Sequence, residues 1–138
     1  MAHWLMKSEA HTWSWDEQVA AGAKGTNWDG MRNHQAKAHL KAMQEGDTAF
    51  FYHSGDQRAV VGIIEIIGTY EPDPSDETAK FGMVRVRARE PFATPVTLSQ
   101  IKADARLKDM VLVNNSRLSV QPVTAAEWKA VLALGKGG

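Results

Sequence analysis

The sequence has no cysteine among its 138 residues. Disulfides, thiolate metal sites and cysteine nucleophiles are therefore excluded. An excess of charge is also missing, because 16 lysines and arginines balance 16 aspartates and glutamates and the formal net charge is zero. Since no overall field attracts a polyanion, any role in nucleic-acid binding would depend on a local basic patch.

Long apolar runs are absent too. No window approaches the roughly 20 apolar residues of a membrane span, and the first residues do not resemble a secretory leader. We therefore expect a cytoplasmic protein with no membrane partner. The length fits one domain over residues 1–138, which is enough to bury a core, with residues 136–138 as a flexible tail.

The apolar pattern mixes strands with short helices, which predicts an α+β fold. Ser14 with Glu17, and Thr124 with Glu127, have the spacing of capping boxes. Nearly every position of 58–70 is apolar, which indicates a strand buried on both faces, as in a small closed barrel. Strands are expected at 3–8, 47–54, 58–70, 83–90 and 118–123, and helices at 14–21, 33–43, 98–107 and 124–134.

The segment 28–36 combines an aromatic ring, a turn and amide side chains. Trp28 offers a flat face on which a base can stack, for about 1–3 kcal/mol. Asn33 and Gln35 carry amide groups that can contact a base edge at two points. A structural interpretation stays open, in which Asp29-Gly30 is only a turn, Asn33 a helix cap and Trp28 a core residue.

Cationic side chains gather in and after this segment. No acidic residue occurs from 30 to 44, and the alternation in 83–90 places three arginines on one face of a strand. Solvated faces explain such residues about equally well. The candidates for phosphate contact are Arg32, Lys37 and Arg117, and Lys41, Arg85, Arg87 and Arg89 would extend the patch.

Four sequence blocks occur in order along the chain. They are Trp4-Leu5-Met6-Lys7-Ser8-Glu9, Trp28-Asp29-Gly30-Met31-Arg32-Asn33 with Gln35-Ala36, Phe50-Phe51-Tyr52-His53-Ser54, and Ser116-Arg117-Leu118-Ser119-Val120-Gln121-Pro122-Val123. Together they resemble the EVE domain family of the PUA-like superfamily. The resemblance covers nearly the whole chain, and several blocks in one order are more specific than any single motif. Ala10 and His34 depart from the family pattern, which usually has proline and tyrosine there.

The resemblance implies a PUA-like small mixed β-barrel flanked by short helices. It further implies a binding module, and no enzyme, that recognises a modified base in an aromatic-lined pocket, either a modified cytosine in DNA or a modified base in RNA. We expect no cofactor, no metal and a monomer. The expected ligand-binding residues are Lys7, Ser8, Trp28, Arg32, Asn33, Gln35, Tyr52, His53, Ser54, Ser116, Arg117 and Ser119, with Trp4, Trp13, Trp15, Phe51 or Tyr52 as the second aromatic wall.

Two other functions stay open. One is a small-ligand or nucleotide-binding module that uses the same pocket. The other is a hydrolase or ribonuclease in which a histidine acts as acid or base. The sequence has no nucleophile elbow, P-loop or His-Glu-x-x-His spacing that would support catalysis. The catalytic candidates would be His34, His39 or His53, with Asp29 or Asp47 as partner and Lys7 or Ser54 as nucleophile.

Overall fold

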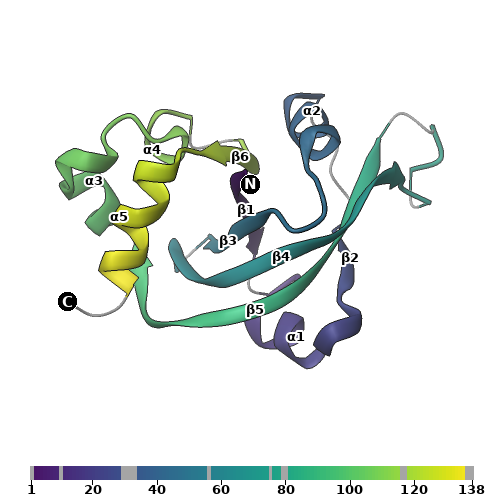
Figure 1. Ribbon diagram of the computed structural model, residues 1–138, viewed down its shortest axis with the longest axis horizontal. Coiled ribbons are helices and arrows are strands. Elements are labelled where there is room, and N and C mark those ends of the chain that lie inside the picture. The colour runs from purple at the N-terminus through teal and green to yellow at the C-terminus, as the bar shows by residue number, and fades with distance from the viewer. Residues whose placement is uncertain are drawn as a thin grey trace.

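A mixed β-sheet with helices against both faces forms the protein, as the computed structural model shows (Figure 1). The structure describes residues 2–9, 11–28, 34–55, 57–74, 76–78, 81–115 and 118–135. Its strands are β1 (His3–Glu9), β2 (Thr26–Trp28), β3 (Thr48–Ser54), β4 (Ala59–Pro72), β5 (Gly82–Thr97) and β6 (Val120–Val123). Its helices are α1 (Trp15–Ala20), α2 (His34–Ala42), α3 (Leu98–Ala103), α4 (Val111–Asn114) and α5 (Ala125–Gly135), with short 3₁₀ turns η1 (Gly22–Lys24) and η2 (Ala105–Leu107).

The strand order is β2-β5-β4-β3-β1-β6. The β1–β3 pair is parallel, and the other neighbouring strands are antiparallel. The predicted α+β class is thus confirmed. Across the described residues β2 and β6 each pair on one side only, so the curved sheet stays open and the word barrel applies loosely.

The curvature comes from the two long central strands. The β4–β5 register shifts at several places, one of them next to Gly62, which indicates β-bulges that bend and twist the pair. Residues 59–64 of β4 are buried on both faces, as predicted, but in the rest of the predicted strand, to residue 70, only Ile66 is buried. Because pairing continues past the bulges to Ala59 opposite Thr97, β5 extends well beyond the predicted end at residue 90.

The short strand β2 was not predicted. It pairs with β5 through three residues, with Trp28 opposite Val84. Gly25, directly before it, has φ +69°, and a Cβ there would lie 2.1 Å from the carbonyl oxygen of Val86. Only glycine therefore permits this approach of the two backbones, a requirement that the local sequence does not announce.

Both predicted capping boxes are present. Ser14 accepts from the Glu17 amide at 3.1 Å at the start of α1, and Thr124 accepts from the Glu127 amide at 3.1 Å at the start of α5. The helix predicted at 98–107 is divided, because Asp104 adopts an extended backbone between α3 and η2.

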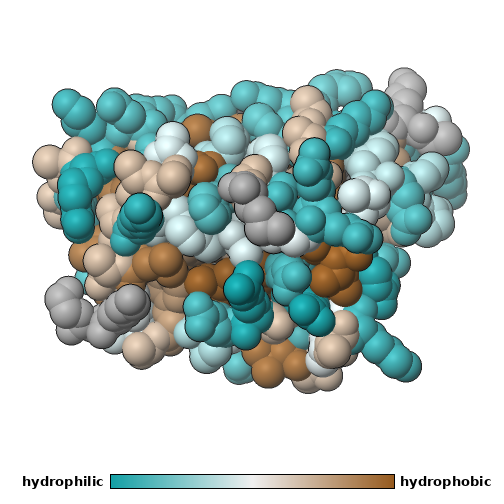
Figure 2. Space-filling view, in the orientation of Figure 1, coloured by the Kyte–Doolittle hydropathy of each residue, from teal (hydrophilic) through white to brown (hydrophobic). Residues whose placement is uncertain are grey.

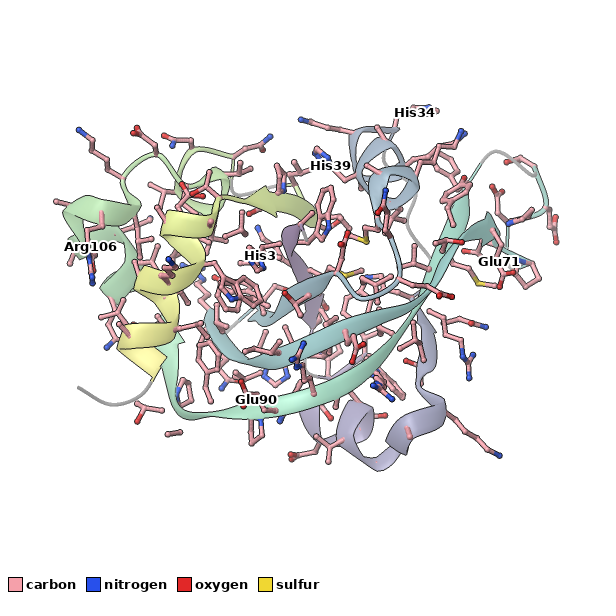
Figure 3. All side chains as sticks on the ribbon, in the orientation of Figure 1. His3, His34, His39, Glu71, Glu90 and Arg106 are labelled. Carbon is pink, nitrogen blue, oxygen red and sulfur yellow. The ribbon has the colours of Figure 1, made fainter. Side chains whose placement is uncertain are left out.

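Two apolar clusters fill the space on either side of the sheet. The first lies between the sheet and α1 and α2, and contains Trp4, Met6, Trp15, Trp28, Leu40 and Phe51. The second lies between the sheet and α3 to α5, and contains Leu5, Phe50, Tyr52, Ile101 and Trp128. In this second cluster the ring of Trp128 stacks between those of His3 and Phe50, with centroids 4.3 Å and 3.9 Å away; Figure 3 shows His3 between the strands and α5.

Candidate functional site

Five of the predicted site residues meet at one edge of the sheet. Because β1 and β3 are parallel, their carboxyl ends lie together, with Lys7 opposite Tyr52 and Ser8 opposite His53. Side chains alternate between the faces of a strand. Ser8 and His53 therefore lie on the side of the first apolar cluster, whereas Lys7, Tyr52 and Ser54 lie on the side of the second.

The first group forms what we call the strand-end cluster: Ser8, Trp13, Trp15, Gln18 and His53. The hydroxyl of Ser8 donates to the carbonyl oxygen of Trp13 at 2.6 Å. The backbone N–H of Trp15 donates to Nε2 of His53 at 3.0 Å, and Nδ1 of His53 lies 2.5 Å from Oε1 of Gln57. His53 therefore accepts at Nε2 and donates from Nδ1, which is the neutral form. These contacts fix the turn that carries both tryptophans.

Gln18 is completely buried within this cluster. Its Oε1 accepts from the indole N–H of Trp13 at 2.8 Å and from the hydroxyl of Thr26 at 3.1 Å. An indole N–H can only donate, so the amide orientation is determined. Nε2 of Gln18 is buried without a hydrogen-bond partner. A buried unpaired donor costs about 1–3 kcal/mol, and such an atom is suited to meet an acceptor.

Trp28 lies in the first apolar cluster and is 6% exposed. Its ring meets Phe51 edge-on, with centroids 5.6 Å apart, and Phe51 meets Trp15 edge-on at 5.4 Å. The structure thus joins Trp28 to the aromatic side of the strand-end cluster through Phe51. Its role as a stacking surface stays a prediction.

The other predicted contacts of this region lie on and around α2. Gln35 is exposed. Nζ of Lys37 lies 5.7 Å from the centroid of the Phe81 ring, and Nζ of Lys41 lies 5.4 Å from that of Tyr70. These lysines therefore cover aromatic rings of the β4–β5 hairpin by cation–π contacts. Arg32 and Asn33 lie outside the described residues, as do Ser116 and Arg117.

On the opposite side of the sheet edge lies a cavity of about 320 Å³, which we call the basic cavity. The carbonyl oxygen of Ser119 accepts from the backbone N–H of Lys7 at 2.9 Å, which places this predicted residue beside the cavity. The described residues that line the cavity are Lys7, Tyr52, Ser54, Gly55, Arg58, Leu98, Lys102 and Leu112.

Burial changes the titration of two of these groups. It lowers the pKa of Lys7, whose Nζ lies 5.7 Å from the centroid of the Tyr52 ring. It raises the pKa of Tyr52, an effect that the charge of Arg58 opposes. The Tyr52 hydroxyl thus keeps its proton at neutral pH and can donate a hydrogen bond.

A larger cavity of about 660 Å³ lies between α1, η1 and the middle of β4 and β5. Its lining carries both charges, and Arg87 pairs with Glu65 at 2.9 Å. Arg85 is also engaged, because it donates to Oδ1 of Asn27 at 3.1 Å. The face of three arginines is therefore partly used in internal contacts. Figure 2 shows that exposed hydrophobic side chains on the face in view form separate patches among hydrophilic ones.

Among the described residues the structure shows no hydrogen bond or ion pair between Asp47 and any of the predicted candidates His34, His39 and His53, and Asp29 lies outside the described residues. Asp47 precedes β3 and accepts from the indole N–H of Trp4 at 3.1 Å and from the amide of Gln44 at 3.0 Å. His53 lies near the other end of that strand, about 20 Å away at the usual rise per residue. His34 is exposed on α2, and its ring centroid is 5.1 Å from that of Phe81.

The described ranges lack both a metal-binding cluster and a membrane-spanning helix. They contain no group of three or more histidine, cysteine, aspartate or glutamate side chains arranged to hold a metal ion. None of the helices in these ranges has the length and apolar character needed to cross a bilayer.

A family model for the EVE domain matches residues 2–134. The chain belongs to the EVE domain family. Human thymocyte nuclear protein 1 is 32% identical to this EVE domain over 96% of the chain and 73% of the human sequence. The chicken protein of the same name is 34% identical over 96% of the chain and 68% of its own length.

Solved structures show the same fold. A protein from Rhodopseudomonas palustris is 56% identical, with a TM-score of 0.93 over 98% of this chain and 93% of that one. The human THYN1 protein, solved in complex with DNA containing 5-methylcytosine, is 32% identical, with a TM-score of 0.90 over 99% and 98% of the two chains. A YTH domain from Zygosaccharomyces rouxii shares the fold alone, at 19% identity and a TM-score of 0.61.

Sequence reasoning did not identify three residues of this EVE domain that the structure brings to the sheet edge. Arg58 follows the β3–β4 turn, so its position next to the end of β3 agrees with the predicted hairpin. Lys102 comes from α3, far along the chain, and Gln18 from α1, and no local pattern links either to this edge.

Proposed function

We propose that this EVE domain binds nucleic acid that carries a modified base, with modified cytosine in DNA as the first candidate. The observation that carries the proposal is the likeness to the human THYN1 protein, which was solved with 5-methylcytosine-containing DNA and matches 99% of this chain. The TM-score of 0.90 supports the proposal, because the overall arrangement of strands and helices is the same in the two proteins.

The strand-end cluster supplies the chemistry that such a ligand needs. Base recognition uses aromatic faces for stacking and polar groups for the base edge. Trp13 and Trp15 lie on one fixed turn, and Gln18 beside them has a buried N–H₂ group without a partner. Together with Trp28, these residues are our proposed base-binding side of the sheet edge.

Discrimination by a methyl group alone would be small. One buried CH₂-sized group contributes about 0.8 kcal/mol, or roughly fourfold in affinity. A larger preference requires a shaped cavity or a polar group that pairs only with the modification. The size of the preference therefore reports how the site recognises its ligand.

The test is binding of short single- and double-stranded oligonucleotides that carry cytosine, 5-methylcytosine or 5-hydroxymethylcytosine. Tryptophan fluorescence gives the signal. The titration also gives the stoichiometry, and we expect a monomeric protein to bind as one molecule per oligonucleotide. We expect tighter binding of one modified strand. Equal, weak binding of all strands would reject modified cytosine and leave modified RNA and free nucleosides to be tested in the same way.

A matched pair of variants locates the site. Trp13→Phe removes the indole that contacts Gln18, whereas Trp128→Phe changes an indole that α5 carries on the other side of the sheet. We expect Trp13→Phe to weaken binding of the preferred strand and Trp128→Phe to leave it unchanged. The reverse result would move the site away from the strand-end cluster.

A further inference from the structure

The basic cavity collects positive charge from three separate parts of the chain. Lys7 comes from β1, Arg58 directly precedes β4, and Lys102 comes from α3. Two hydroxyl groups, of Tyr52 and Ser54, also line it. The described residues of the lining include no acidic side chain. This combination of cations and hydroxyl donors suits an oxyanion.

The cavity contrasts with other places where the described chain carries arginine. Arg87 is paired with Glu65 at 2.9 Å, and Arg106 with Asp104 at 2.6 Å. Within the described part of the chain, Arg58 makes one side-chain bond, from Nε to the carbonyl oxygen of Gly55 at 3.2 Å. A guanidinium group has five N–H donors, so the other four of Arg58 meet no acceptor among the described residues.

The backbone of Arg58 is unusual. Its φ is +46°, and it is the one described residue other than glycine with a positive φ. Such a conformation is unfavourable for an arginine and persists where the surroundings hold it. Here the carbonyl oxygen of Arg58 accepts from the backbone N–H of Leu98 at 2.8 Å, so the start of α3 holds it in place.

The same helix carries the third cation. Leu98 and Lys102 are four residues apart on α3, which puts them on one face, and both line the cavity. Lys102 is exposed. The contact between Leu98 and Arg58 therefore sets the positions of two cationic residues relative to each other.

We propose that the basic cavity is a phosphate-binding site. A volume of about 320 Å³ admits a phosphate with an attached sugar. Arg58 and Lys102 contact the phosphate oxygens, and the half-buried Lys7 supplies positive charge from the inner side of the cavity. The hydroxyls of Tyr52 and Ser54 donate hydrogen bonds to the phosphate. The phosphate belongs either to a nucleic-acid backbone next to the recognised base, which rests on the proposed function, or to a free nucleotide.

The first experiment uses inorganic phosphate and the whole chain, without any nucleic acid. Phosphate is titrated while the backbone amide signals are followed by NMR. We expect saturable shifts at Gly55, Arg58 and Lys102, and loss of these shifts in Arg58→Gln and Lys102→Gln. Lys129→Gln, which removes an exposed charge on α5, is the matched control and should respond like the wild type.

The second experiment identifies the source of the phosphate. Affinity for the preferred oligonucleotide is measured at several salt concentrations. If the cavity holds a backbone phosphate, Arg58→Gln should weaken binding and reduce the slope of log K against log salt by about 0.9 for duplex or about 0.7 for single strands. Phosphate shifts at the cavity with an unchanged slope would support the site and assign it to a free nucleotide.

The outcomes separate this proposal from the proposed function. Absence of phosphate shifts at the cavity, with an unchanged slope in both variants, would overturn the phosphate site even if the wild type binds modified DNA. Cavity shifts in a protein that binds no oligonucleotide would support the phosphate site and reject the proposed function. Thermal unfolding of each variant shows whether it is folded before either result is read.

Discussion

The backbone N–H of Trp15 donates to Nε2 of His53 at 3.0 Å, which ties the first turn of α1 to the end of β3. The histidine is 7% exposed, and its other ring nitrogen contacts Gln57. Both ring nitrogens are thus used inside the protein, and the side chain positions the turn of the strand-end cluster. This arrangement favours a structural role for His53. It argues against a role in catalysis and against direct contact with a base edge.

We therefore predict that His53→Phe is destabilising. The ring is kept but both hydrogen bonds are lost, so the free energy of unfolding should fall by about 1–3 kcal/mol, the usual effect of an unpaired buried donor. Urea denaturation measures it. The control is His11→Ala, because the His11 side chain is 82% exposed and its Nε2 lies 3.0 Å from Oε2 of Glu9 at the surface. An unchanged stability of His53→Phe would show that the contact with Trp15 is unimportant.

A second prediction concerns the ring of Trp15 and Gly62 of β4. A Cβ on Gly62 would lie 2.5 Å from ring atoms of Trp15, closer than real contacts allow. Gly62→Ala should therefore force the ring to move and lower the free energy of unfolding by about 1–3 kcal/mol, as overpacking does.

The double variant tests this cause. Trp15→Phe shortens the ring, so Gly62→Ala should be less harmful in that background, and a double-mutant cycle by urea denaturation gives the coupling. Additive effects of the two changes would mean that Gly62 is needed for its backbone and not for the room it leaves.

Periodicity and capping patterns predicted most elements of this fold. The capping boxes at Ser14 and Thr124, the doubly buried β4 and the proline-containing edge strand β6 all follow from local sequence. The second half of β5 and the strand β2 do not. Both depend on pairing between distant segments, through the bulges of β4 and the close approach of Gly25 to Val86.

The candidate site was predictable in part, for the same reason. Consecutive strand-end residues such as Lys7 and Ser8 are visible in the sequence, and strand alternation alone places them on opposite faces. Their partners Tyr52 and His53 depend on the register of β1 with β3. Arg58 is near them because a hairpin returns there, and Lys102 because Leu98 bonds to Arg58. Such juxtapositions are tertiary and leave no local pattern.

A third prediction concerns pH. Burial lowers the pKa of His39, and its Nε2 is buried without a partner; Figure 3 shows this residue on α2. The folded state therefore binds a proton less readily than the unfolded state. Stability should be complete above the unfolded pKa of about 6.5 and should decrease as pH falls from there through the lowered folded value.

Replacement by leucine tests this dependence, because His39→Leu removes the titrating group. Urea denaturation between pH 5 and 7.5 should give a shallower loss of stability on acidification than in the wild type. Some loss will remain, since burial also lowers the pKa of His3. An equal loss in both proteins would show that His39 does not contribute.

The last prediction separates stability from binding at Arg58. With φ at +46°, arginine is strained there, whereas asparagine adopts this conformation more readily. Arg58→Asn should raise the free energy of unfolding by about 0.5–1 kcal/mol, because it relieves the strain. Arg58→Val, which is β-branched, should lower it.

If the cavity binds phosphate, the more stable Arg58→Asn protein should also have lost the phosphate-induced amide shifts, because it lacks the guanidinium. Opposite effects on stability and on binding in one variant would mean that the strain at Arg58 is retained for the ligand. If Arg58→Asn is instead less stable than the wild type and keeps the phosphate-induced shifts, Arg58 has a purely structural role.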